Sequence, residues 1–182
     1  MKYLVPEELE TERLLLRQFQ DEDWRELHEM YSDEEATRYT VGHACTEGES
    51  WRLMAAIIGH WQLRGYGPYA AVEKASGRVV GPVGFWFPND WPSPEIKYAL
   101  ARKFWGQGYA REAVLAIQRA GARHLPDIAL ISLIHRDNLA SVKLAQSVGA
   151  VLERVEEFRG GQWCVYRHPR VEGCEKAASA ES

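Results

Sequence analysis

The sequence predicts a single α/β domain. Segments with strand composition alternate with segments whose apolar residues recur at helical spacing. One segment, residues 128–134 (IALISLI), is almost continuously apolar, as expected of a central strand covered on both faces. A chain of 182 residues, of which 46% are hydrophobic, can bury one core. We expect this domain to span residues 1–171, because residues 172–182 have little to bury and predict a disordered tail.

The N-terminal third of the chain predicts one strand and two helices. Residues 13–19 (RLLLRQF) have the apolar composition of a strand, and Asp21 is a suitable cap for the helix that follows. A second helix, predicted over residues 49–63, carries its apolar side chains at helical spacing until Gly65 breaks the pattern.

Three further strands are predicted next. Residues 69–73 and 79–87 form a hairpin around a turn at residues 75–77. Residues 95–101 (EIKYALA) have the composition of a half-buried strand, and the proline-rich bend at residues 88–94 separates them from the hairpin.

The second half of the chain predicts two helices and three strands. Residues 110–121 place alanine and larger apolar side chains on one helical face. After the apolar strand, Asp137 or Asn138 opens another helix, which ends at Gly149. Two strands complete the domain, at residues 151–158 and 162–166.

Composition and charge narrow the function classes. A net charge of −4 with dispersed basic residues argues against binding to nucleic acid or to an anionic membrane. The cysteines, Cys45, Cys164 and Cys174, are odd in number and widely spaced, so they indicate reduced thiols and not a disulfide frame or a zinc site. No segment resembles a signal peptide or reaches membrane-spanning length. We therefore expect a cytoplasmic protein.

The most informative segment is the glycine-bearing turn within residues 103–114 (KFWGQGYAREAV), between a predicted strand and a predicted helix. Gly106 and Gly108 allow a tight turn and the close approach of a ligand. The helix start that follows offers unpaired N–H groups and the positive end of a dipole, which suits a phosphate or pyrophosphate. The alternative is an ordinary loop, because the segment matches neither of the common phosphate-loop patterns.

Four motifs in this order resemble the GCN-five-related N-acetyltransferase (GNAT) family, in particular its RimJ/RimL-like branch. They are residues 9–17 (LETERLLLR), residues 95–98 (EIKY), residues 105–113 (WGQGYAREA), and residues 138–141 (NLAS) with Gly149. The resemblance extends from about residue 10 to residue 169. It implies a mixed, mostly antiparallel central sheet of about seven strands, splayed between the fourth and fifth, and flanked by about four helices.

The resemblance also implies acetyl-coenzyme A as cosubstrate, and no metal. Its pyrophosphate is expected on the backbone amides of the glycine-bearing loop, and its pantetheine arm along the strand before this loop, as an added strand would pair. Trp105 departs from the general family pattern but is usual in this branch. The residues expected to bind the cosubstrate are Tyr98, Ala99, Leu100, Ala101, Trp105, Gly106, Gln107, Gly108, Tyr109, Ala110, Arg111, Asn138 and Ser141.

Two residues are catalytic candidates. Glu95 begins the strand that would hold the thioester, so it is the best candidate for the base that takes the amine proton; the alternative is a strand-end carboxylate in solvent. The resemblance implies that Ser141 hydrogen-bonds the leaving thiolate, because the position that often carries a tyrosine in the family is Ala145 here. Asn138 and Ser141 also suit a plain helix cap and a solvent-facing hydroxyl.

The predicted activity is direct transfer of acetyl to a primary amine, either a protein N-terminal α-amino group or a small-molecule amine. Trp51, Trp61, Trp86 and Trp91 are candidates for the acceptor pocket, although most tryptophans belong to a core or an interface. Ala145 favours one alternative function, a non-catalytic coenzyme A-binding sensor or scaffold. A homodimer is compatible with the family resemblance.

Overall fold

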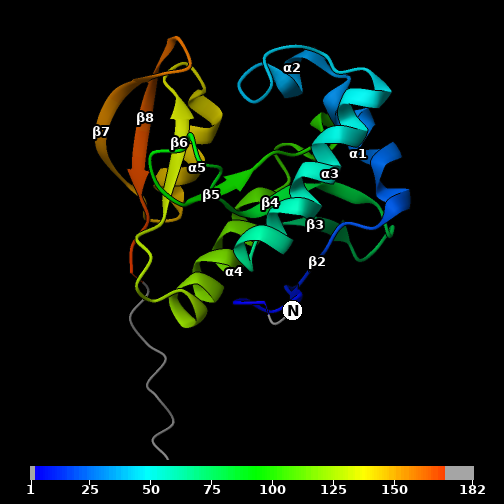
Figure 1. Cartoon of the computed structure of the whole chain (residues 1–182), viewed down its shortest axis with the longest axis horizontal. Helices are drawn as coiled ribbons and strands as arrows, with labels where there is room; N and C mark the ends of the chain where they lie inside the picture. Colours follow the sequence, from blue (N-terminus) through cyan, green and yellow to red (C-terminus); the bar gives the residue numbers. More distant parts are fainter. Residues whose placement is uncertain (1–2, 171–182) are drawn as a thin grey trace, which may run out of the picture.

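A computed structural model describes residues 3–170 and shows one eight-stranded sheet in the order β1-β2-β3-β4-β5-β6-β8-β7 (Figure 1). The predicted α/β fold is confirmed. In chain order the elements are β1 (Glu8–Glu10), β2 (Leu14–Arg17), α1 (Trp24–Tyr31), α2 (Glu34–Thr37), α3 (Glu47–Arg64), β3 (Pro68–Glu73), β4 (Val79–Trp86), β5 (Glu95–Tyr98), α4 (Tyr109–His124), β6 (Ile131–His135), α5 (Leu139–Ser147), β7 (Val151–Phe158) and β8 (Gly161–Arg167). The predicted tail, residues 172–182, lies outside the described residues.

Sequence patterns missed two short elements. The strand β1 pairs with β2 and makes the sheet eight strands wide, where about seven were predicted; three residues are too few for an alternating pattern to emerge. The helix α2 has four residues, capped by Asp33, and was missed for the same reason. The predicted cap at Asp21 is wrong: a 3-10 turn begins there, and the carboxylate of Asp23 accepts the Gln20 N–H at 2.8 Å.

Two strand boundaries also differ from prediction. The strand β5 ends at Tyr98, three residues earlier than predicted, because the chain turns into a 3-10 helix at Arg102–Phe104. The strand β6 begins at Ile131, three residues later than predicted. Both strands are therefore shorter than their apolar runs, because burial extends beyond the paired residues.

Every neighbouring pair in the sheet is antiparallel except β5 and β6, which run parallel. The two strands pair only at Glu95 and Ile131, which confirms the predicted splay. The prediction placed it between the fourth and fifth strands, which are β5 and β6 once the strand β1 is counted. Two side-chain hydrogen bonds continue the connection where backbone pairing stops. Ser132 Oγ donates to the Ile96 carbonyl at 2.9 Å, and the Leu133 N–H donates to a carboxylate oxygen of Glu95 at 3.1 Å.

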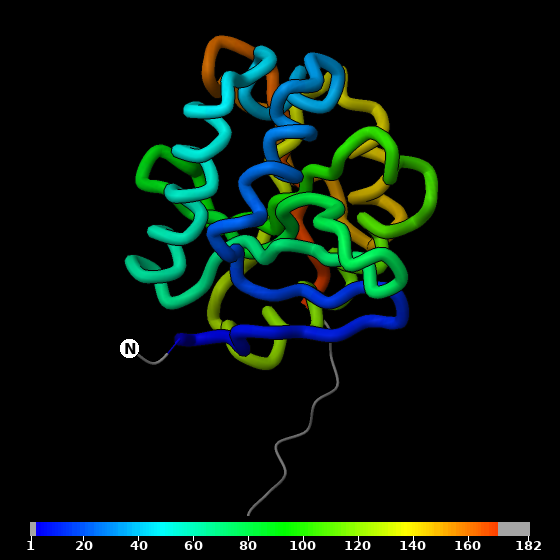
Figure 2. Tube along the Cα trace, turned by 90° about the vertical axis from the view of Figure 1, so that its right-hand side faces the viewer, coloured from blue at the N-terminus to red at the C-terminus, as the bar shows by residue number. Residues whose placement is uncertain are grey.

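Helices pack against the central strands β4 and β5 of the sheet. Figures 1 and 2 both place α1 and α3 side by side, and α1 also contacts β4, while α4 packs against β4 and β5. The core between these layers includes the fully buried side chains of Trp61, Tyr69 and Phe85. Within residues 3–170, no helix is both long and apolar enough to cross a membrane.

A buried chain of polar groups links α4 to the two diverging strands. The Gln118 side-chain amide donates to His168 Nδ1 at 2.8 Å, and His168 Nε2 lies 2.9 Å from Ser132 Oγ, which in turn donates to Ile96. This direction of donation requires a neutral imidazole that carries its proton on Nε2. Burial lowers the pKa of His168 to about 4. The splay of β5 and β6 is therefore stabilised by an uncharged histidine.

We expect the stability of the domain to fall as the pH drops from about 6.5 towards 4, because an unfolded histidine binds a proton near pH 6.5 while folded His168 does not. The loss attributable to this residue is about 3 kcal/mol at pH 4. Urea unfolding at half-unit pH intervals measures it. His168→Asn should flatten this part of the profile, whereas His124→Gln, at the exposed end of α4, should keep it. Equal slopes for both variants would contradict the assignment.

Candidate functional site

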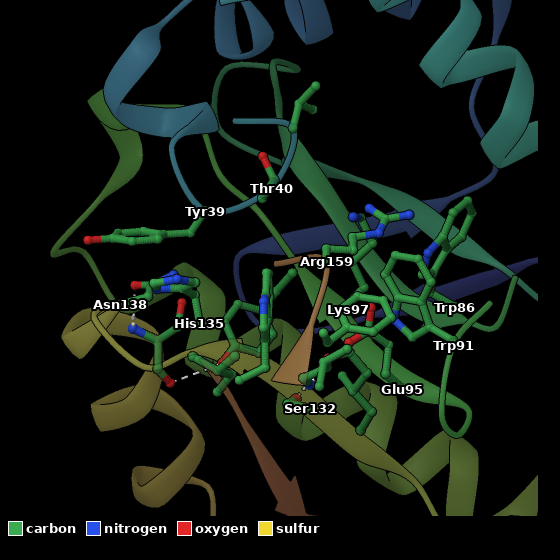
Figure 3. Close-up of a pocket in the computed structure, with 18 of the residues that line it drawn as sticks. Tyr39, Thr40, Trp86, Trp91, Glu95, Lys97, Ser132, His135, Asn138 and Arg159 are labelled. Carbon is green, nitrogen blue, oxygen red and sulfur yellow. Dashed lines mark hydrogen bonds between the residues drawn. The ribbon is translucent and has the colours of Figure 1, made fainter. Parts of the chain in front are cut away.

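Two cavities meet where β5 and β6 diverge. The larger, of about 510 Å³, lies between the end of β5, the loop before α4 and the start of α5. The smaller, of about 320 Å³, lies between the β4–β5 bend, β6 and the β7–β8 hairpin (Figure 3). The residues that line both cavities are Tyr39, Thr40, Tyr98, Asn138 and Ser141. A group bound in one cavity can therefore reach a group bound in the other at this junction.

The glycine-bearing loop reaches the larger cavity with its backbone exposed. Gly106 and Gly108 have φ angles of +72° and +83°, a region that glycine adopts without strain. Gly108 is the N-cap of α4, and no side chain caps this helix. The first turn of α4, including Tyr109, Ala110 and Arg111, lines the cavity. The helix start therefore presents open N–H groups and the positive end of the helix dipole to the cavity.

Trp105 ties this loop to the end of β5. Its indole Nε1–H donates to the Leu100 carbonyl at 2.7 Å, and its ring lines the larger cavity. This contact gives a physical reason for tryptophan at a position where the general family pattern differs.

Glu112 anchors the same loop to the N-terminal strands. Its carboxylate accepts hydrogen bonds from Thr11 Oγ1 at 2.5 Å and from both the backbone N–H and the Nε of Arg13 at 2.7 Å. A guanidinium nitrogen of Arg13 donates to the Gln107 carbonyl at 2.9 Å. Burial opposes ionisation of Glu112, but these hydrogen bonds and the Arg13 charge lower its pKa overall. Glu112 has a structural role in holding the loop.

The backbone of β5 and the residues after it has one edge directed to the gap. The N–H groups of Ala99 and Ala101 donate to the carbonyls of Pro82 and Val80, so they belong to the β4 side. Because donors alternate along a strand, the N–H groups of Tyr98 and Leu100 point to the opposite edge, towards the gap. Tyr98 and Leu100 therefore keep a backbone donor available on this edge.

The larger cavity gathers most of the residues predicted to bind the cosubstrate. Those that line it are Tyr98, Ala99, Leu100, Trp105, Gly106, Gly108, Tyr109, Ala110, Arg111, Asn138 and Ser141. Ala101 and Gln107 lie outside this lining. Ala101 is buried with its N–H bonded to Val80, and Gln107 binds protein groups, its side-chain amide donating to the Lys103 carbonyl and its own carbonyl accepting from Arg13.

Asn138 and Ser141 fit parts of both interpretations that the sequence left open, a helix cap and a place in the binding site. Asn138 is the N-cap of α5, and its Oδ1 accepts the Ser141 N–H at 3.2 Å. The Tyr98 hydroxyl donates to the Ser141 carbonyl at 3.0 Å. Both Asn138 and Ser141 also line the junction of the two cavities, and these two hydrogen bonds hold the Ser141 backbone there.

Ala145 does not belong to the site. It is 0% exposed and packs in a small apolar cluster with Ile134, Ala150, Cys164 and Tyr166. Neither cavity is lined by it. Packing therefore explains an alanine at this position.

Glu95 is 5% exposed and lines the smaller cavity, so a solvent-facing carboxylate at the strand end is the wrong interpretation. Burial raises its pKa, and the charge of Lys97 and the hydrogen bond from Leu133 act in the opposite direction. A carboxylate with a raised pKa is a stronger base than one in water. Glu95 therefore has the properties of a proton acceptor at the end of the smaller cavity.

Of the four candidate tryptophans, only Trp86 and Trp91 line the smaller cavity. Trp61 belongs to the core, where its Nε1–H donates to the Pro68 carbonyl at 2.9 Å, and Trp51 is 50% exposed outside both linings.

Sequence reasoning missed several lining residues of the smaller cavity, namely Tyr39, Lys97, His135, Phe158, Arg159 and Trp163. Lys97 was detectable, because it lies two residues after Glu95 and side chains two apart on a strand share a face. The others come from elements that only the tertiary fold brings to the site.

The fold also brings together His43, Cys45 and Glu49. Their possible ligand atoms lie within 4.8 Å of one another. Glu49 already caps α3 through Thr46. This group lies before and at the start of α3, outside both cavities.

Comparisons with known proteins identify the family and the fold of this chain. A family model described as an acetyltransferase (GNAT) domain matches residues 13–151. The chain is 32% identical over 166 residues to a protein named N-acetyltransferase p20 from Bacillus licheniformis, a match that covers 88% of this chain and 93% of that protein.

Solved structures share the fold. A GNAT-family acetyltransferase structure from Bordetella pertussis has a TM-score of 0.77 at 26% identity and covers 90% of this chain and 100% of its own. The structure of RimL, a ribosomal L7/L12 α-N-protein acetyltransferase in complex with coenzyme A, has a TM-score of 0.71 at 21% identity, covering 90% of this chain and 96% of that one. At this identity the second match shows the fold alone.

We expect Glu112→Gln to lower the free energy of unfolding by about 1.5–3 kcal/mol at pH 7, because charge-assisted hydrogen bonds from Thr11 and Arg13 are lost. Urea denaturation measures this change. Glu10→Gln is the matched control: Glu10 is 73% exposed in its ion pair with Lys74, so its replacement should change the stability by less than about 0.5 kcal/mol. Equal stability of the two variants would refute the anchoring role of Glu112.

Proposed function

Because this chain belongs to the GNAT acetyltransferase family, we propose that it transfers the acetyl group of acetyl-coenzyme A directly to a primary amine. The amine is either a protein N-terminal α-amino group or that of a small molecule. In this proposal the larger cavity binds the coenzyme and the smaller cavity binds the acceptor.

One observation carries the proposal. The two cavities share Tyr98, Asn138 and Ser141, one of them leads to an uncapped helix start, and the other leads to the buried carboxylate of Glu95. Direct transfer needs this arrangement, since the thioester and the amine must meet beside a proton acceptor.

The residues present fit acetyl-coenzyme A. The open amides at the start of α4 suit its pyrophosphate. The free N–H groups of Tyr98 and Leu100 suit the amide groups of the pantetheine arm and the thioester carbonyl, which would lie along the exposed strand edge. Beside these groups, the Ser141 side chain lines the junction where the sulfur would lie.

Glu95 and Ser141 have separate roles in the proposed reaction. As the amine nitrogen bonds to the acetyl carbon, its proton passes to Glu95, directly or through water, and the carbon–sulfur bond breaks. The electron pair of that bond stays on sulfur, and the Ser141 hydroxyl hydrogen-bonds the thiolate. A thiol with a pKa of about 8.5 leaves readily, so a hydroxyl is an adequate partner at this position.

The proposal includes a cytoplasmic setting. Buried, unpaired thiols at Cys45 and Cys164 are compatible with it; Cys174 lies outside the described residues. A homodimer stays a prediction of the family resemblance.

Gly108→Glu should weaken acetyl-coenzyme A binding about 100-fold or more, because a carboxylate at the start of α4 shields the amides and repels the phosphates. Calorimetric titration measures the dissociation constant. Gly77→Glu is the matched control. Gly77 also has a positive φ, and it lies in the β3–β4 turn, where an added Cβ would have open space around it; at Gly108 the added Cβ would lie 3.3 Å from the flexible end of Arg13. We expect the control to bind within about twofold of the natural protein. If Gly108→Glu binds as tightly as the control, the coenzyme does not lie on this loop.

Glu95→Gln should lower kcat at neutral pH by about 10²- to 10³-fold, because the amide cannot accept a proton. In the natural enzyme the rate should fall as the pH drops below the raised pKa of Glu95, and this dependence should disappear in the variant. Steady-state kinetics across pH measure both effects.

A second substitution separates chemistry from structure. Glutamine keeps an oxygen that can accept the Leu133 N–H, so Glu95→Gln should stay folded, whereas Glu95→Ala should also lose stability. Full activity of Glu95→Gln would show that another group takes the proton.

A further inference from the structure

Lys97 places a positive charge in the smaller cavity beside the Glu95 carboxyl. It follows Glu95 by two residues on β5, so both side chains project into the cavity from the same face (Figure 3). Burial lowers the pKa of Lys97, and within residues 3–170 Glu95 is the carboxylate whose charge opposes this change. Its nearest aromatic neighbour is Trp86, whose ring centre lies 5.5 Å from the Lys97 Nζ. Lys97 is half-buried, so it needs a nearby negative charge, and Glu95 stops supplying one when it is protonated.

Arg159 brings a second cation to the same cavity, and its backbone conformation is strained. It has a φ angle of +49°, the only positive φ of a non-glycine residue in the described chain. It begins the two-residue turn between β7 and β8, a position that favours asparagine or glycine. An unfavourable residue at a strained position indicates a role for its side chain. That side chain lies over the rings of Trp91 and Phe158, at 4.5 and 5.3 Å, and pairs with Asp90 at 3.0 Å.

The walls between these two cations are aromatic. Trp86, Trp91, Phe158 and Trp163 follow one another in edge-to-face contacts with ring centres 5.3–6.3 Å apart. All four line the cavity, which has a volume of about 320 Å³. Such walls match a flat apolar group, and a cavity of this volume can hold a small one.

We propose that the acetyl acceptor is a small monoamine that carries both a carboxylate-type anion and a flat apolar group, and that Lys97 and Arg159 bind this anion. This inference rests on the proposed function, because it assigns the acceptor of the same site. It makes the acceptor amino-acid-like, with the amine directed to Glu95, the anion to the two cations and the apolar group to the tryptophans.

The charges of the cavity disfavour the other amine classes. The two carboxylates that line the cavity already balance its two cations, since Asp90 pairs with Arg159 and Glu95 acts on Lys97. The several positive charges of a polyamine or another polycation would therefore find no free negative charge there. A peptide N-terminus has no carboxylate beside its amino group, so it would leave Lys97 without a counter-ion. Glu95 does not fill this role once it has taken up the amine proton, because it is then neutral.

The test compares acceptors that differ in one group. Phenylalanine and 2-phenylethylamine share the amine and the ring but differ in the carboxylate; spermidine and a short peptide with a free N-terminus represent the other classes. We expect kcat/KM for phenylalanine to exceed that for each of the others by at least about tenfold. A preference for 2-phenylethylamine, spermidine or the peptide would overturn the proposal.

Two variants test whether Lys97 and Arg159 bind the anion of the acceptor. Lys97→Met should reduce the preference for phenylalanine over 2-phenylethylamine at least about fivefold, mainly through KM, while Lys74→Met in the β3–β4 turn should keep it. Arg159→Asn should also reduce the preference, and it should raise the midpoint of thermal unfolding by about 2 °C because asparagine suits the turn. An unchanged preference in both cavity variants would refute the assignment. Because Arg159→Asn is expected to be folded and more stable, such a result could not be attributed to misfolding.

Calorimetric titration with acetyl-coenzyme A on the same samples separates this inference from the proposed function. Binding of the coenzyme together with transfer to an acceptor class other than the predicted one refutes the inference alone. Absence of both binding and transfer with every acceptor refutes the proposed function and the inference with it.

Discussion

The separation of β5 from β6 is the constraint on which the site depends. The two strands pair only at Glu95 and Ile131, and side chains then take over from the backbone: Ser132 bonds to the Ile96 carbonyl, and Glu95 accepts the Leu133 N–H. Because these contacts satisfy buried polar groups at the point of divergence, the strands can part without leaving such groups unpaired. Both cavities open onto the gap that results. A regular parallel ladder here would remove the free strand edge and the junction between the cavities.

The same contacts connect stability to chemistry. The Glu95 carboxylate bridges the diverging strands, and in the proposed mechanism it also receives the amine proton. Its burial both raises its pKa and makes its hydrogen bond to Leu133 part of the core. The coenzyme side is fixed separately, by the Trp105 contact to Leu100 and by the Glu112 contacts to Thr11 and Arg13. Substitutions on the two sides should therefore affect acceptor chemistry and coenzyme binding independently.

The sequence predicted what is encoded locally. Gly106 and Gly108 indicated a loop that needs positive φ, and Asn138 indicated a helix start; both are local properties of a few consecutive residues. The burial of Glu95 was not predictable in this way, because it depends on β6 and on the β7–β8 hairpin, which lie far away in the chain. Lys97 and Arg159 resemble ordinary surface cations until the fold places them in one cavity. The strand β1 was not predicted, because three residues are too few to show an alternating apolar pattern.

The most direct test of the central claim is amide hydrogen exchange, followed by NMR, with and without coenzyme A. If the coenzyme lies in the gap between β5 and β6, binding should slow the exchange of the Tyr98 and Leu100 amides together with those at the start of α4. The Ala99 and Ala101 amides, already bonded to Pro82 and Val80, should change much less. Protection confined to other parts of the chain would contradict the account, since the free edge of β5 would then have no part in binding the coenzyme.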